Sequence, residues 1–248
     1  MFLYIVYTVF KKVSVSAMET TGGEAPVCRY TDESILNKYA AKLLHPLKSN
    51  GLHNLRMDDF AKAMDLSKAT LYKYFQSRDE IIERLTALFV KYVVGSCSEV
   101  ELVSGSSDAY IQSFQSTFSQ TLLIANYGTE IFFKDLREIY PQHMASIDIA
   151  ISERNARLRK FYERGMAEGY LNTLNATLLI LEDELMFRHL LDPMYLMKNN
   201  LTLRGAIGDY YQIKKLQLFK PDIHASIDDT QMLDKIEYLV RKVTYGVA

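Results

Sequence analysis

The sequence predicts an all-α protein. Apolar residues recur with a helical period through most of the chain, and residues that start or stop helices stand between these stretches. Only 5 Pro and 11 Gly interrupt 248 residues, of which 48% are hydrophobic and 24% charged. This composition is sufficient for the core of one large or two small domains. We expect no β-sheet.

The N-terminal segment Met1–Phe10 is almost wholly apolar and is followed by two lysines. It is shorter than the roughly 20 apolar residues that span a bilayer. Its positive charges follow the apolar run, whereas those of a signal peptide precede it. Two interpretations remain open: translation starts at Met18 and residues 1–17 are an upstream artefact, which we favour, or the segment is a genuine extra strand or interfacial helix. Residues 1–30 are expected to form a disordered or mis-started arm.

Two helices are predicted next. Apolar residues at helical spacing run from Ile35 to Leu47, where Pro46 disturbs the last turn and Gly51 is placed to end the helix. A short helix follows over 56–64, and then a turn begins at Asp65. Aspartate is among the few residues that tolerate the left-handed backbone of such a turn.

The stretch from Leu66 to Phe75 predicts a short cationic helix. Ser67 is a good N-cap, because its hydroxyl can accept a hydrogen bond from the Thr70 amide, and Leu66 can contact Leu71 as a hydrophobic staple. Leu71 and Phe75 stand four residues apart and share the buried side. We expect the free side to carry Lys68, Thr70, Lys73 and Tyr74.

A long helix is predicted to start near Arg78. Ser77 and Glu80 have the capping-box spacing, in which each side chain satisfies the other's backbone amide. Apolar residues then recur at helical spacing as far as Val93. The small and polar residues of 95–107 indicate a connection to the next element.

Helical patterns continue through the C-terminal two thirds. The predicted helices cover 107–127, with Ser107 or Asp108 as the cap, and then 129–140, 141–168, 175–191, 202–219 and 230–244. The helices at 175–191 and 202–219 are apolar on more than one side, which predicts that one side meets a partner. The residues expected to face outward are Leu178, Leu179, Leu181, Met186, Leu190, Ile207, Tyr211 and Leu218.

Charge and cysteine content limit the protein class. A net charge of -1 argues against a chain uniformly coated with basic residues for nonspecific nucleic-acid binding. Residues 31–94 nevertheless carry ten Lys and Arg against eight Asp and Glu, a net charge of about +2. Cys28 and Cys97 are too few for a disulfide framework and are interpreted as unpaired thiols in a reducing cytoplasm.

The sequence offers no catalytic constellation. Glu182, Asp183 and Glu184 are neighbours on a helix and point in different directions, so a solvated face is expected. Neither a glycine-rich phosphate loop nor a nucleophile elbow occurs. The histidines lack metal-ligand spacing and are His45, His53, His143, His189 and His224. We therefore expect no enzyme, no catalytic residue, no metal and no cofactor.

From Ser34 to Leu85 these features resemble the N-terminal domain of the TetR (tetracycline-repressor) family of transcription regulators. The resemblance rests on the order and spacing of Gly51, Asp59-Phe60-Ala61, Leu66-Ser67, Thr70-Leu71-Tyr72-Lys73-Tyr74-Phe75 and Ser77-Arg78-Asp79-Glu80. The chain departs from the family at four positions. It has Asp65 and Ala69 where glycine is common, Phe60 in place of a smaller aliphatic, and Arg78 in place of lysine.

The resemblance implies a domain organisation and a DNA-binding helix. Residues 31–77 would form a three-helix helix-turn-helix domain, joined by a long helix to a helical effector-binding and dimerisation domain within 78–248. The helix at 68–75 would enter the major groove of double-stranded DNA. Lys68, Thr70 and Lys73 would reach bases or phosphates, and Tyr72, Tyr74 and Arg78 would hold phosphates.

The resemblance also implies a cytoplasmic homodimer without membrane association, which represses transcription and leaves its operator when a small-molecule effector binds. Several aromatic and methionine side chains could line the effector pocket, although their helical spacing is equally well explained if they are core residues. They are Phe114, Phe118, Phe132, Phe133, Met144, Phe161, Met186 and Phe187. Two alternatives remain. One is a protein of this shape that acts mainly through protein partners, and the other is a helical enzyme.

Overall fold

The structure is a computed structural model that describes residues 30, 32–96 and 105–245. All the regular elements within these residues are helices, which confirms the predicted fold class. The β-type pairing among them is limited to one isolated antiparallel bridge between Leu171 and Phe219. The predictions for residues 1–17, Cys28 and Cys97 lie outside the described residues.

The N-terminal helices are α2 (Glu33–Lys42), α3 (Leu44–Asn50), α4 (Met57–Ala63), α5 (Lys68–Tyr74) and α6 (Arg78–Gly95). The single first helix that we predicted is therefore two helices, α2 and α3, separated at Leu43. Gly51 ends α3 with a φ of 67°, and Asp65 adopts a φ of 57° in the turn before α5, both as expected.

The C-terminal helices are α7 (Ser107–Tyr127), α8 (Glu130–Ile139), α9 (Pro141–Ala167), α10 (Ala176–Leu190), α11 (Pro193–Lys198), α12 (Leu203–Leu218), α13 (Pro221–Ser226) and α14 (Thr230–Tyr245). The cap of α7 is Ser106, one residue before the predicted Ser107. We did not predict α11 and α13, each of which has a proline in its first turn. None of the helices in the described ranges combines the length and apolar character that a bilayer crossing requires.

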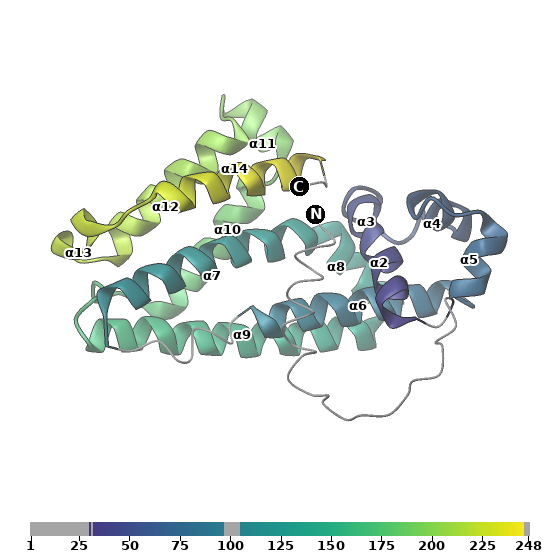
Figure 1. Ribbon diagram of the computed structural model, residues 1–248, viewed down its shortest axis with the longest axis horizontal. Coiled ribbons are helices and arrows are strands. Elements are labelled where there is room, and N and C mark those ends of the chain that lie inside the picture. The colour runs from purple at the N-terminus through teal and green to yellow at the C-terminus, as the bar shows by residue number, and fades with distance from the viewer. Residues whose placement is uncertain (1–29, 31, 97–104, 246–248) are drawn as a thin grey trace, which may run out of the picture.

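Figure 1 shows how the helices are arranged. α4 and α5 lie at one end of the elongated molecule, and α13 lies at the other. The long helices α6 and α9 pack along each other and form one side of the body. α7 packs against α10 and α14, and α12 completes the opposite side. The first turn of α6 thus adjoins α5, while the rest of α6 belongs to the body of the molecule.

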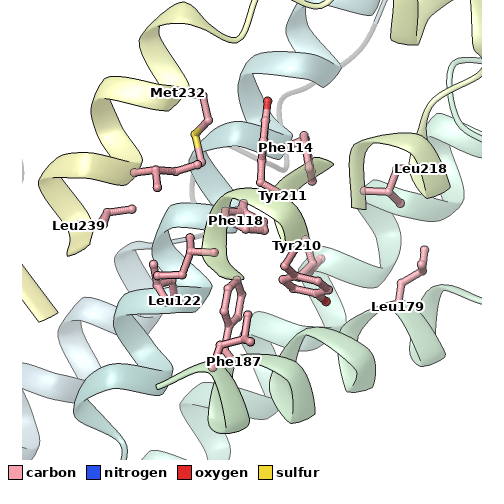
Figure 2. Close-up of a cluster of buried hydrophobic side chains, with 14 of the residues drawn as sticks. Phe114, Phe118, Leu122, Leu179, Phe187, Tyr210, Tyr211, Leu218, Met232 and Leu239 are labelled. Carbon is pink, nitrogen blue, oxygen red and sulfur yellow. The ribbon is translucent and has the colours of Figure 1, made fainter. Parts of the chain in front are cut away.

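One hydrophobic cluster fills the C-terminal half between α7, α10, α12 and α14 (Figure 2). The Phe114 ring stacks on the Tyr211 ring at a centroid distance of 5.5 Å, and the Phe118 ring meets the edge of Phe187 at 5.1 Å. These phenylalanines therefore pack against neighbouring side chains as core residues. Their participation in an effector pocket stays a prediction.

A second hydrophobic cluster joins the N-terminal helices to α8 and the first turns of α9. Phe132 and Leu136 of α8 and Met144 of α9 are buried in the same cluster as residues of α2 to α6. The Tyr140 hydroxyl, between α8 and α9, donates a 2.5 Å hydrogen bond to Asp79 in the first turn of α6. A shift of α8 would therefore disturb contacts with the N-terminal helices. The domain boundary between residues 77 and 78 stays a prediction.

The outward residues of α10 and α12 were predicted only in part. Leu178, Leu181 and Met186 are exposed, as expected. Five of the predicted outward residues are instead buried in the first cluster, namely Leu179, Leu190, Ile207, Tyr211 and Leu218. They face inward because α7 and α14 cover sides of the pair that periodicity alone had left open.

The position of Asp183 also differs from the prediction. We predicted a solvated carboxylate, but Asp183 is buried between α10 and α12, where the Tyr210 hydroxyl donates to it at 2.6 Å. The Lys214 ammonium, 3.0 Å away, is also buried. A charged group enters this contact because an opposite charge and a hydroxyl on the facing helix satisfy it. The neighbouring Glu184 is exposed, as expected.

Candidate nucleic-acid interface

The short helix α5 is held at its start by the cap that the sequence predicted. The Ser67 hydroxyl accepts a 3.1 Å hydrogen bond from the Thr70 amide, and the two hydroxyl groups lie 2.8 Å apart. Leu71 is buried behind the helix, and Phe75 is buried just after its end. One side of α5 is thus fixed in the core, and the side chains on the other side meet solvent.

Tyr72 and Lys73 lie on the exposed side of α5. The Tyr72 side chain is 48% exposed, which is unusual for an aromatic residue. The exposed Lys73 has its ammonium 5.6 Å from the centroid of the Tyr30 ring, within the range of a cation–π contact. Both residues occupy the places that we predicted for them. They offer a phenolic hydroxyl and a cation to a ligand at this end of the molecule.

Lys68, in the first turn of α5, is also exposed but is already paired. Its ammonium lies 2.8 Å from the Asp58 carboxylate of α4. The hydrogen bond from Lys68 lowers the pKa of Asp58, and the same bond raises the pKa of Lys68. The carboxylate partly neutralises the cation on this surface. Asp58 stands ten positions away in the sequence, so the pair depends on how α4 and α5 cross and has no local sequence signal.

The placement of Tyr74 was wrong. We expected it on the free side of α5, but the side chain is only 5% exposed. Its ring lies 4.9 Å from the ring centroids of both Tyr30 and Tyr39. Tyr74 faces inward because it is three positions after Leu71 and follows that residue around the helix onto the same side. Its predicted phosphate contact is untested, and the burial does not favour it.

Arg78 lies at the start of α6 and is half-buried. Its guanidinium donates a 2.6 Å hydrogen bond to the carbonyl of Leu52, in the turn between α3 and α4. Ser77 caps the helix through the Glu80 amide at 3.1 Å, as predicted. The Glu80 carboxylate, however, accepts a hydrogen bond from the backbone amide of Gln76, whereas the predicted capping box has it accept from the backbone amide of Ser77. Arg78 therefore ties α6 to the preceding turn.

The structure brings together four of the six predicted DNA-contacting residues on the exposed part of α5: Lys68, Thr70, Tyr72 and Lys73. Thr70 is half-buried, and its hydroxyl is close to that of Ser67. Arg78 lies beyond the end of α5, and Tyr74 faces the core. The contacts of all six with DNA stay predictions.

Comparison with known families supports the sequence interpretation. Residues 45–85 match the family model described as bacterial regulatory proteins, tetR family. The match covers α3 to the middle of α6 and includes the whole of α4 and α5. A search of curated proteins finds no match.

Solved structures with similar folds cover most of the chain. A TetR-family transcriptional regulator from Marinobacter aquaeolei VT8 aligns with a TM-score of 0.56 and 15% identity over 82% of this chain and 98% of that chain. A transcriptional regulator from Saccharomonospora viridis in complex with choline gives 0.51 and 13% over 75% and 96%. A structure described as superantigen pfit gives 0.51 and 14% over 87% and 100%.

At these identities the structural matches establish the fold alone. They agree with the family match, because two of the three are described as transcriptional regulators and the regulator from Marinobacter is assigned to the TetR family. Residues 45–85 therefore match the sequence pattern of bacterial regulatory proteins of the tetR family, and the chain has the fold of a TetR-family transcriptional regulator.

Proposed function

We propose that the protein is a transcription regulator that binds double-stranded DNA through α5. The observation that carries this proposal is the two-sided character of α5. Leu71 and Tyr74 are buried, whereas Lys68, Tyr72 and Lys73 are exposed at the end of the molecule. A short helix fixed from behind and polar in front can enter the major groove of about 12 Å width.

The protein is proposed to bind DNA as a homodimer. α10 exposes Leu178, Leu181 and Leu185 at spacings of three and four residues, so they lie along one side of the helix. The adjacent α12 exposes Ile213 and Leu216. Such an apolar surface on a pair of packed helices suits a symmetric interface. Two copies would present two α5 helices to two related half-sites.

Repression and release by a small-molecule effector complete the proposal. An effector shifts the DNA-binding equilibrium only if it binds the DNA-free conformation better, and a hundredfold preference corresponds to roughly 2.7 kcal/mol. The contacts of α8 and α9 with the N-terminal helices provide a physical connection. Phe132 and Leu136 share their core, and Tyr140 binds Asp79 at the start of α6.

The test is selection of genomic fragments from the source organism with the purified chain, followed by binding measurements on the selected duplex. We expect one preferred sequence with two related half-sites. The variant K73A should weaken binding and reduce the dependence of log K on log salt concentration by about 1, because one phosphate contact is lost. The matched control is K160A, which changes an exposed lysine of α9.

The outcomes separate the functions. Selection of no preferred duplex, combined with capture of a specific protein, would favour the protein-partner alternative. Equal loss of affinity in K73A and K160A would show that charge alone, and not the α5 surface, determines binding. Turnover of a small molecule by the purified chain would favour the enzyme alternative.

A further inference from the structure

Three potential metal ligands from distant parts of the sequence meet beside the helix-turn-helix region. His53 lies in the turn between α3 and α4, and Asp135 and Glu138 lie on α8. The His53 Nε2 atom is 3.7 Å from Asp135 Oδ1 and 3.2 Å from Glu138 Oε2. One ligand atom from each of the three residues fits within 4.8 Å of the others. The proposed DNA contacts of α5 do not use these residues.

The Asp135 carboxylate is fixed by backbone donors. Its Oδ2 atom accepts hydrogen bonds from the amides of Leu52 and His53. The side chain is only 9% exposed, so these bonds form in a protected place. The other oxygen, Oδ1, faces the His53 ring and lies 3.7 Å from its Nε2 atom. Hydrogen bonds that orient a carboxylate in this way are typical of the surroundings of metal ligands.

Gly51 allows the backbone to approach Asp135 this closely. A Cβ atom at this position would lie 2.4 Å from Asp135 Oδ2, and the φ of 67° is one that other residues rarely adopt. The glycine therefore both ends α3 and leaves room for the carboxylate between the turn and α8. The path of the backbone at Gly51 therefore determines where the Asp135 carboxylate can lie.

The ligand atoms are spaced for a small transition-metal ion. Bonds of about 2.0–2.1 Å at tetrahedral angles place two ligand atoms about 3.3–3.4 Å apart. The observed separations of 3.2 and 3.7 Å lie on either side of this value. An imidazole nitrogen among carboxylates favours zinc-like ions over Mg²⁺ and Ca²⁺, which prefer oxygen ligands alone. His53 and Glu138 are about half exposed, so an ion can reach the site from solvent.

We propose that His53, Asp135 and Glu138 bind a divalent transition metal of the zinc type, with solvent completing the coordination. The ligands come from both sides of the contact between the helix-turn-helix region and α8. A bound ion would therefore hold the two together, and a movement that separates them would release the ion. This departs from our expectation from the sequence that the protein has no metal site.

The test is calorimetric titration of zinc chloride into the full-length chain, without an affinity tag and after dialysis against a chelator. We expect one zinc ion per chain at this site and at least about a tenfold loss of affinity in each of H53Q and E138Q. The matched controls are H189Q on α10 and E130Q on α8, which change exposed residues of the same types and should bind as the wild type does. Magnesium chloride should give no comparable binding.

Thermal unfolding provides a second measurement. Zinc should raise the Tm of the wild type and of both controls by more than that of H53Q or E138Q, because an ion that binds only the folded chain stabilises it in proportion to its affinity. Unchanged zinc affinity in both ligand variants would place the ion elsewhere and overturn the proposal. Failure of the wild type to bind zinc below about 1 mM would reduce the cluster to an ion pair, and equal binding of magnesium would overturn the assigned metal class.

Discussion

The Lys214 ammonium of α12 lies 3.0 Å from a carboxylate oxygen of Asp183 on α10, and both side chains are buried. The same ammonium donates to the carbonyl of Leu179 and to Glu182, each at 3.0 Å. All three donors of the lysine are thus used. Burial raises the pKa of the Asp183 carboxyl, although Lys214 and the Tyr210 hydroxyl act in the opposite direction. This network joins the two helices that carry the proposed dimer interface.

Removal of the lysine charge should destabilise the fold. We expect Lys214→Met to lower the free energy of unfolding by roughly 3–5 kcal/mol, because Asp183 would remain buried without its cation. Urea denaturation at fixed protein concentration measures the loss. The double variant K214M/D183N should lose less than the sum of the single variants. Additive losses would show that the two groups do not interact.

The loss of unfolding free energy in K214M should also depend on pH. Because the folded pKa of Asp183 is raised above its ordinary value of 3.8, the folded chain takes up this proton more readily than the unfolded chain does. Without Lys214 the raised pKa should rise further, so a lower pH favours the folded variant. The stability difference between wild type and K214M should shrink between pH 7.5 and 5. A constant or growing difference would contradict this assignment.

Loss of the Asp58 charge should strengthen DNA binding. In Asp58→Asn, Lys68 loses the carboxylate that partly neutralises it and becomes free to approach a phosphate. We expect a few-fold increase in affinity for the selected duplex at low salt, measured by fluorescence anisotropy. The control D234N removes an exposed carboxylate from α14 and should have no effect. An equal increase in both variants would indicate a general charge effect.

Tyr74 should contribute to stability and not to DNA contact. Tyr74→Ala removes a ring that packs against Tyr30 and Tyr39, and should cost roughly 3 kcal/mol in urea denaturation. Tyr74→Phe keeps the ring and should bind DNA with the wild-type affinity. Weaker DNA binding by a fully stable Y74F would instead support the phosphate contact that the sequence suggested.

The apolar side of α10 should determine the oligomeric state. Leu185→Glu places a charge in the proposed interface and should convert the dimer to a folded monomer in size-exclusion chromatography with light scattering. Circular dichroism checks that the helices persist. The control L233E introduces the same charge at an exposed leucine of α14 and should remain dimeric. A dimeric L185E would place the interface elsewhere.

The sequence predicted the long helices well, because their caps and periodicities are local signals. The Ser67 cap, the glycine that ends α3 and the start of α6 lie where expected. Tyr74 and Asp183 were misplaced for a different reason. Both residues are buried by side chains of other helices. The periodicity of one helix does not predict which of its polar sides another helix will cover.

The cluster around His53 illustrates the same limit of local patterns. His53 stands 82 positions before Asp135, and no motif relates residues at that separation. Only the packing of α3 against α8 brings them together.

The short helices α11 and α13 were missed because six residues are too few to show a helical period.

The peptide group that joins Leu52 to His53 is used at both ends. Its N–H, which belongs to His53, donates to Asp135 of α8 at 3.2 Å, and its carbonyl, which belongs to Leu52, accepts from Arg78 of α6 at 2.6 Å. A peptide plane is rigid, so it cannot absorb a displacement by bending. Any shift of Asp135 must either carry the Arg78 guanidinium with it or break one of two hydrogen bonds. A single planar group thus connects α8 mechanically to the start of α6, the helix that directly follows α5.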